Sequence, residues 1–264
     1  MKKENKLINK INCLLNRANI PRWLHHFGPK KYEFYMHVVC LLAKEIMKFS
    51  FRRVSSILGM LGFKVPSYSA LCKMRKRIPL LIWQNILQMT ARFNSNLVAV
   101  DSTGFSRQNP SFYYIKRIDR EKPVKRYVKL SAFLDTKNKK FIALRIRAKP
   151  RHDVLDVSYL LKQRCNMKKL LGDSAYDAEF IHKLAYEKNI VTIIKPKKNV
   201  KRGTYRRSQV KNYSESTYHR RSMIESGFSS LKRKFGSIVL SKTAPAQRAE
   251  LYCKIIAYNL GLTN

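Results

Sequence analysis

The order of strand-like and helix-like segments after residue 96 is the feature that most restricts the fold. Leu97 to Val100 form a short apolar run, typical of a buried strand, that ends at Asp101. An antiparallel hairpin is predicted next, because residues 125–134 and 140–148 alternate apolar and polar positions around a turn. The remaining expected elements are a helix at about 153–164, a strand at 168–172, a helix at 178–188, a strand at 190–195 and a helix at 216–234. This order predicts an α/β fold, in which a mixed sheet is flanked by helices.

The first 95 residues show helical rather than strand periodicity, with apolar residues at helical spacing in 32–49, 54–61 and 70–89. Gly62 can end one helix, and Ser67 or Ser69 can cap the next. We therefore expect an all-helical, helix-turn-helix-like DNA-binding region over 1–95 and a second domain over 96–264. The residues expected to meet phosphates or base edges are Lys73, Arg75, Lys76 and Arg77. The alternative is an ordinary helical hairpin with a solvated basic surface.

The charge of the chain is strongly unbalanced. It has 55 Lys and Arg against 16 Asp and Glu, a formal net charge of +39. Such an excess favours a polyanionic partner, and double-stranded DNA fits because binding releases its counterions. A general basic drift of the surface is the alternative. Residues 195–212 hold eight Lys or Arg and no acid, so we expect either a mobile basic loop that orders on DNA or a solvated linker.

Cysteine usage and hydropathy indicate the compartment. The five cysteines are odd in number and form no C-x-x-C pair, which indicates a reducing environment without a zinc knuckle or disulfide framework. No apolar run approaches the roughly 18 residues that span a membrane. We therefore expect a cytoplasmic, nucleoid-associated protein.

Carboxylates are scarce in this chain, so their positions are informative. Asp101 and Asp173 each follow a predicted strand. If these strands are parallel neighbours, both side chains emerge at one edge of the sheet, where open α/β sheets bind ligands. Two oxygen ligands would then converge, as a hard divalent cation requires. The alternative is that each aspartate caps a helix or begins a turn.

A third carboxylate, Glu225, lies within a predicted helix. At 100° per residue, Tyr218, Arg221 and Lys232 share with Glu225 a stripe about 60° wide. An adjacent apolar stripe would seat the helix on the sheet, and its members are Ile224, Phe228, Leu231 and Phe235. The polar stripe would then border a groove. Surface ion pairs at helical spacing are the alternative.

The spacing Tyr218-x2-Arg221-x3-Glu225-x6-Lys232 resembles the signature of DDE transposases of bacterial and archaeal insertion sequences, the group that spans families four and five. Asp101-Ser102-Thr103 resembles the first-aspartate motif of that family. Residues 173–177 resemble the second, with Ala175 in place of the usual glycine. The resemblance covers about residues 50–264, and it implies a ribonuclease H-like catalytic domain.

The resemblance also implies a reaction and its participants. Asp101, Asp173 and Glu225 would hold two Mg²⁺ ions, with Mn²⁺ able to replace them, while Tyr218, Arg221 and Lys232 would contact transposon-end DNA. The enzyme would cut the element's ends and use the freed 3′-OH to attack target DNA. A homodimer on DNA is expected because both ends have to be cut. The alternatives are a structure-specific nuclease of the same fold and a DNA-binding regulator derived from a transposase.

Two further segments carry weaker signals. Asp153 is placed to cap the helix that follows it, and His152 to contact a backbone phosphate, although a metal or acid/base role for this pair is the alternative. Residues 248–262 are apolar at helical spacing and are expected to form a packing helix.

Overall fold

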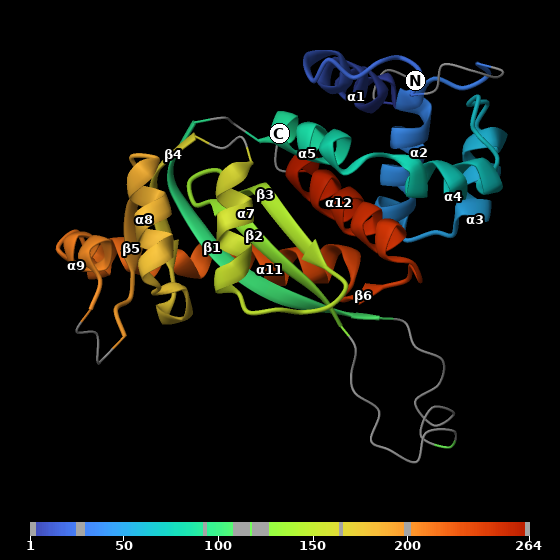
Figure 1. Ribbon diagram of the computed structural model, residues 1–264. Coiled ribbons are helices and arrows are strands. Elements are labelled where there is room, and N and C mark those ends of the chain that lie inside the picture. Colours follow the sequence, from blue (N-terminus) through green and yellow to red (C-terminus); the bar gives the residue numbers. More distant parts are fainter. Residues whose placement is uncertain are drawn as a thin grey trace. The chain divides into compact units, whose positions relative to one another are not determined.

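The computed structural model describes residues 4–24, 30–91, 94–107, 117, 127–163, 166–197 and 202–261. The chain forms two compact units (Figure 1). Residues 1–91 and 248–264 form the first, which we call the helical unit, and residues 92–247 form the second, the sheet unit. Within the described residues, no helix combines the length and the apolar character needed to cross a membrane.

The helical unit consists of α1 (Glu4–Arg17), α2 (Phe34–Met47), α3 (Phe51–Met60), α4 (Tyr68–Arg77), α5 (Leu80–Thr90) and most of α12 (Ala244–Gly261). The expected division gave every residue after 95 to the second domain, and the structure differs at α12. Residues 251–260 are all buried, including the polar Lys254 and Asn259. The Tyr252 ring stacks on Trp83, and the Asn259 amide donates to the Thr90 hydroxyl at 2.9 Å.

The expected helix-turn-helix-like segment is formed by α3 and α4. Gly62 lies just after α3 with a φ of 81°, a value that glycine adopts without strain. The Ser67 hydroxyl accepts the backbone N–H of Ala70, so Ser67 rather than Ser69 is the cap of α4. The apolar pattern at 70–89 is divided between two helices, α4 and α5, because Pro79 cannot continue a helix.

The sheet unit is built on β1 (Asn94–Arg107), β2 (Tyr127–Asp135), β3 (Lys140–Arg147), β4 (Asn166–Gly172), β5 (Val191–Ile194) and the short β6 (Ile238–Val239). The strand order is β3-β2-β1-β4-β5, with β6 pairing the end of β1. The first three strands are antiparallel, whereas β4 and β5 run parallel to β1. This is the mixed sheet that the sequence predicts.

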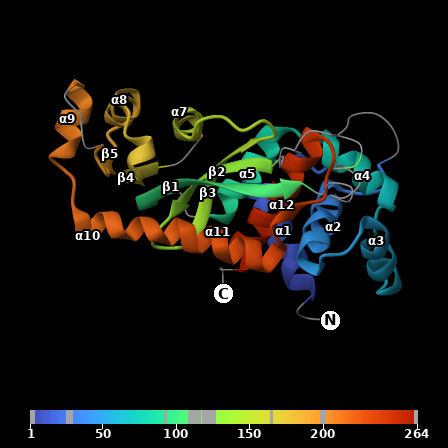
Figure 2. The same ribbon diagram turned by 90° about the horizontal axis from the view of Figure 1, so that it is seen from below.

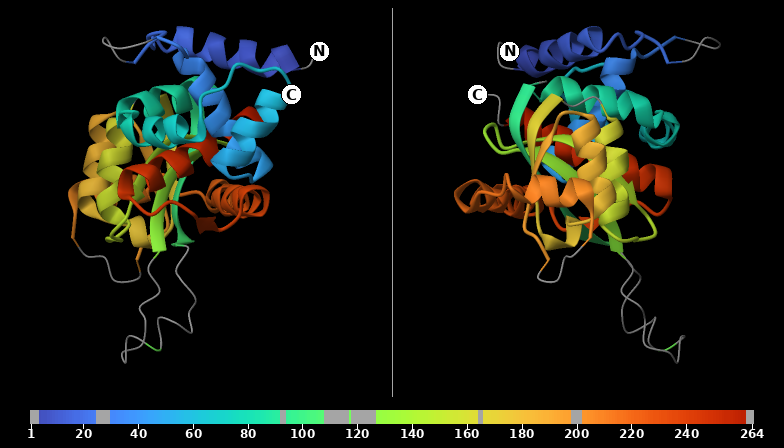
Figure 3. Two further views of the ribbon diagram at one scale, coloured as in Figure 1. Left: turned by 90° about the vertical axis from the view of Figure 1, so that its right-hand side faces the viewer. Right: turned by 60° about the vertical axis from the view of Figure 1, so that its left-hand side comes forward.

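Helices cover both faces of this sheet. The helices α7 (Val154–Lys162) and α8 (Glu179–Glu187) lie against one face, and α11 (Ser222–Phe235) lies against the other (Figure 2). The first two also pack against each other (Figure 3). The predicted apolar stripe of α11 is buried, and the Phe228 ring stacks on Phe141 with the centroids 5.5 Å apart.

Strand β1 is longer than expected. We expected it to end at Asp101, but it continues to Arg107 because β2 pairs with it through Ser106 and β6 pairs with its last two residues. Asp101 therefore lies within β1. The neighbouring β4 does end at Gly172, as predicted.

The basic segment 195–212 also differs from its prediction as a mobile loop or linker, because it contains helix α9 (Thr204–Val210). The Arg206 guanidinium pairs with Asp177 through two nitrogen atoms, and the backbone N–H groups of Tyr205 and Arg206 each donate to the Glu179 carboxylate at 3.0 Å. These contacts hold α9 beside α8. Residues 198–201 lie outside the described part of the chain.

Candidate active site

Asp101 and Asp173 come together because β1 and β4 are parallel neighbours. Ala99 of β1 pairs with Leu171 of β4, and each aspartate stands two residues further along its own chain segment. Burial, with a smaller contribution from the negative charges of Asp173 and Glu225, raises the pKa of Asp101 to about 6, although the Ser102 N–H and Arg221 oppose the shift. Asp173 and Glu225, from two other segments of the chain, thus both act electrostatically on Asp101.

Local hydrogen bonds orient the two aspartates. One Asp101 oxygen accepts the Ser102 N–H at 2.8 Å, and one Asp173 oxygen accepts the Ala175 N–H at 2.9 Å. Asp173 thereby caps a one-turn 3₁₀ helix, Ser174–Tyr176. The alternative expected from the sequence, that this aspartate begins a turn or caps a helix, is therefore observed, and it is compatible with a place beside Asp101. Gly172 allows this turn to be tight, because a Cβ there would lie 3.2 Å from the Tyr176 Cβ and 3.3 Å from Val100.

Glu225 is paired with Arg221, one turn earlier. The guanidinium lies 2.6 Å from Glu225 Oε1, and the glutamate side chain is 52% exposed. Burial alone would lower the pKa of Arg221, but the hydrogen bond and charge of Glu225 raise it. The Tyr218 ring centroid lies 5.9 Å from the same guanidinium. The predicted helix at 216–234 is observed as α10 (Glu215–Tyr218), a 3₁₀ turn at His219–Arg221 and α11.

Lys232 extends this polar stripe toward β1. Its ammonium lies 5.4 Å from the ring centroid of Phe105, four residues beyond Asp101 on that strand. Partial burial lowers the pKa of Lys232. The stripe therefore follows the end of the sheet that carries the aspartates.

The donor chemistry of the site suits a hard divalent cation, although the side chains are not gathered around one. Carboxylate oxygens are the ligands such cations prefer, and a bound cation would neutralise the negative charge that Asp173 and Glu225 place near the half-buried Asp101. Among the described residues, no three His, Cys, Asp or Glu side chains are arranged to hold a metal ion. Glu225 is turned toward Arg221 instead of the aspartates.

Asp153 is not the helix cap that the sequence predicts. It is the residue before α7, but its backbone is helical and its side chain makes no capping hydrogen bond. Its carboxylate instead accepts the Ser102 hydroxyl at 2.8 Å and lies 2.5 Å from the Lys129 ammonium. Asp153, Ser102 and Lys129 line a cavity of about 310 Å³, and Thr103 is also among its lining residues. His152 is exposed.

The basic residues of α4 fall into two groups. Lys73, Lys76 and Arg77 are exposed. Arg75 is half-buried, with its guanidinium 4.9 Å from the ring centroid of Phe51. We expected all four at the exposed surface, and the difference at Arg75 arises because its long side chain covers the apolar contact between α3 and α4.

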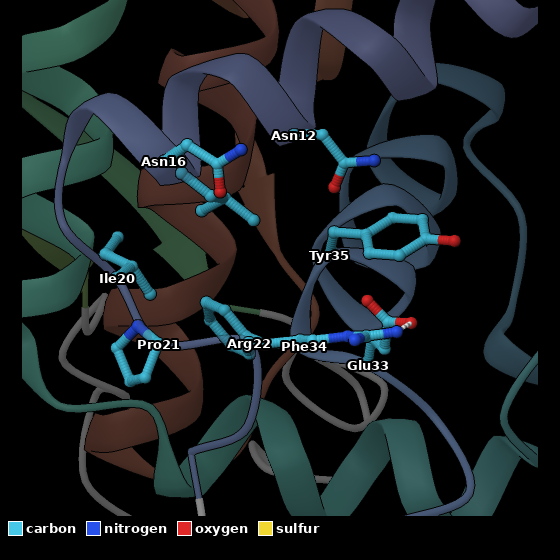
Figure 4. A pocket seen from close by; sticks show the side chains of 9 residues that line it. Asn12, Asn16, Ile20, Pro21, Arg22, Glu33, Phe34 and Tyr35 are labelled. Carbon is cyan, nitrogen blue, oxygen red and sulfur yellow. Dashed lines mark hydrogen bonds and ion pairs between the residues drawn. The ribbon is translucent and has the colours of Figure 1, made fainter.

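A cavity of about 310 Å³ also lies within the helical unit, between α1 and the start of α2 (Figure 4). Asn12, Asn16 and Tyr35 are among the side chains that line it. An ion pair of 2.5 Å between Arg22 and Glu33 closes one side. Glu33 is the only carboxylate among the described residues that line this cavity, so they form no cluster that could hold a divalent cation.

Comparison with known proteins identifies the family. The family described as "Transposase DDE domain" matches residues 92–260, well over half of the chain. The chain belongs to the DDE transposase family. It is therefore a DNA transposase, an enzyme of DNA cleavage and strand transfer, and enzymes of this family generally depend on divalent metal ions.

The other comparisons add a remote structural likeness. No curated protein sequence matches the chain. Among solved structures, the transposase is similar to the piggyBac transposase in its synaptic complex with hairpin DNA, with 13% identity and a TM-score of 0.45. That match covers 97% of this chain and 71% of the other.

Proposed function

We propose that this transposase cuts and joins DNA at the ends of an insertion sequence, with Asp101, Asp173 and Glu225 as the ligands of two Mg²⁺ ions that Mn²⁺ can replace. The observation that carries the proposal is the electrostatic convergence of these three carboxylates from β1, the end of β4 and α11. Bound divalent ions would activate a water or a 3′-OH and stabilise the leaving oxygen.

The surrounding side chains have separate tasks in this proposal. Arg221 binds a DNA phosphate, which competes with Glu225 for its guanidinium and leaves that carboxylate available as a ligand. Lys232 and Tyr218 contact the DNA beside the scissile phosphate. Lys232 carries a positive charge that offsets the charge developing on the phosphoryl oxygens.

The DNA partner is double-stranded, and it includes both the inverted-repeat ends and the target. We propose that α4 contacts the ends through the exposed Lys73, Lys76 and Arg77. Arg75 holds α4 against α3, and its positive charge adds to the attraction of α4 for the DNA phosphates. Cutting two ends requires two active sites, so we expect a homodimer on DNA, acting at the nucleoid. Residues 1–95 would bind the DNA ends and the part after residue 95 would carry the chemistry, except that most of α12 belongs to the helical unit.

The decisive experiment uses purified full-length protein with a duplex of the element's own end. We expect cleavage and strand transfer with Mg²⁺ or Mn²⁺, and none with EDTA. The variant Glu225→Gln keeps the shape but loses the charge of a metal ligand, so it is expected to bind the duplex like the wild type and to lose cleavage. Wild-type protein that binds these ends but leaves them uncut would contradict the proposal.

The same assay separates the two alternatives. A structure-specific nuclease of the same fold would cut the duplex but form no strand-transfer product with a target plasmid. A regulator derived from a transposase would bind and do neither. The three carboxylates favour an enzyme over a regulator, because a protein that only binds DNA does not benefit from negative charges beside its ligand.

A further inference from the structure

A second polar cluster lies directly behind Asp101, on the side of the sheet that α7 covers. Its centre is the carboxylate of Asp153, whose Oδ1 accepts the Ser102 hydroxyl at 2.8 Å and lies 2.5 Å from Lys129 Nζ. Ser102 is the residue after Asp101 on β1, and Lys129 is on the neighbouring strand β2. Three elements therefore meet at one carboxylate.

Lys129 is held firmly in this cluster. The residue is only 4% exposed, and its ammonium also lies 3.3 Å from Asp156 and donates to the Arg151 carbonyl. Asp156 is completely buried and accepts the Ser131 hydroxyl at 2.7 Å as well. A buried ammonium with this many acceptors has little freedom to move, because leaving any of them exposes an uncompensated charge. Asp153 is consequently fixed by a rigid partner.

Ser102 connects this cluster to the active site through two different atoms. Its hydroxyl donates to Asp153, and its backbone N–H donates to Asp101 Oδ1 at 2.8 Å. Successive side chains of a strand point to opposite faces, so Ser102 faces α7 while Asp101 points away from it. The hydroxyl bond to Asp153 therefore links the polar cluster to the residue whose N–H orients the Asp101 carboxylate.

We infer that Asp153, fixed by Lys129, is a positioning residue for Asp101 and acts through the Ser102 hydroxyl. The inference rests on the proposed role of Asp101 as a metal ligand. Groups that orient metal ligands without touching the metal typically change its affinity by about 10–100-fold when removed. Loss of the Ser102 hydroxyl should thus weaken metal binding and leave DNA binding unchanged.

The test measures Mn²⁺ binding to the full-length chain by the electron paramagnetic resonance signal of free Mn²⁺, together with the melting temperature. Ser102→Ala removes the link without changing a charge, and we expect a dissociation constant for Mn²⁺ about 10-fold higher or more. Ser102→Thr restores a hydroxyl and should restore binding. The matched control is Ser106→Ala, the same change at an exposed position of β1, which should bind like the wild type.

Two further variants make the outcome specific. Asp153→Asn keeps an acceptor oxygen but loses the charge that Lys129 holds, so an intermediate loss of Mn²⁺ affinity is expected. Asp101→Ala tests the ligand assignment: unchanged Mn²⁺ binding in this variant refutes the proposed site itself. If Asp101→Ala loses binding but Ser102→Ala does not, the positioning inference alone is wrong. It is also wrong if Ser102→Ala is unstable and Ser102→Thr fails to rescue affinity.

Discussion

His182 is enclosed between α8, β5 and α9, and its protonation is linked to folding. Its ring nitrogens lie 2.7 Å from the Thr192 hydroxyl and 3.1 Å from Asp177. Burial lowers the pKa of His182 and Arg206 lowers it further, against the opposing effect of Asp177. In the unfolded chain His182 is protonated below its ordinary pKa of 6.5, whereas in the folded protein it stays neutral to a lower pH. The free energy of unfolding therefore falls as the pH falls through 6.5.

We therefore expect the melting temperature to drop between pH 7.5 and pH 5.5, and the drop to be smaller in His182→Gln. Calorimetry at both pH values measures this. The exposed His152 provides the control, since His152→Gln should retain the full drop. An equal drop in all three proteins would show that His182 does not control the acid sensitivity.

At the residue scale, local pattern predicted Asp101 and Asp173 because each ends an apolar run, and the structure brings them together across β1 and β4. The role of Asp153 could not be predicted in the same way. Its partner Lys129 lies on another element, and only the packing of α7 against β2 brings the two charges together. The neighbouring sequence alone predicts that Asp153 caps a helix. In the structure its carboxylate pairs with the distant Lys129 and makes no capping hydrogen bond.

At the scale of elements, α11 packs closely against the sheet at Gly227. A Cβ there would lie 2.7 Å from Leu134 Cδ1 of β2, nearer than two carbon atoms can pack. We expect Gly227→Val to lower the free energy of unfolding by about 1–3 kcal/mol through overpacking. Urea denaturation measures this change.

The matched control for Gly227→Val is Ser229→Val, which puts the same side chain on the exposed side of α11. It introduces the same β-branched residue into the helix without the steric conflict. Equal destabilisation by the two variants would contradict the close approach of α11 to β2.

Element boundaries were predictable wherever hydrophobic periodicity and turn residues agree, as in the β2–β3 hairpin and in α8. Helix α9 was missed because its sequence is mostly polar and has no apolar periodicity, and its stability comes from the pairing of Arg206 with Asp177, 29 positions away. The extension of β1 was missed for a related reason. Its last residues are polar, and the partner strands β2 and β6 maintain the hydrogen-bonding ladder.

At the scale of the whole molecule, the net charge of +39 predicts how affinity for DNA depends on salt. The logarithm of the association constant falls linearly with the logarithm of the salt concentration, and each phosphate that the protein neutralises adds roughly −0.9 to the slope. We expect a steep slope for the wild type, reduced by about 1 each in Lys73→Gln, Lys76→Gln and Arg77→Gln. Fluorescence anisotropy across a salt series measures it.

The control for this series is Lys137→Gln. Lys137 is exposed in the β2–β3 turn, near the amino end of β1 and away from the end of the sheet that carries the aspartates. Its loss should leave the slope unchanged. An equal effect of all four substitutions would indicate a diffuse interaction of DNA with the whole surface instead of a contact made by α4.

The position of Asp101 inside a paired strand makes the enzyme intolerant of small changes in chain length before it. Val98 to Phe105 pair continuously with β2, so deleting one residue upstream would shift the register by one and turn every later side chain to the opposite face. Asp101 would then point toward α7, and Ser102 would point toward α11. Frame-preserving deletions that are harmless in a surface loop would here abolish activity in a single step.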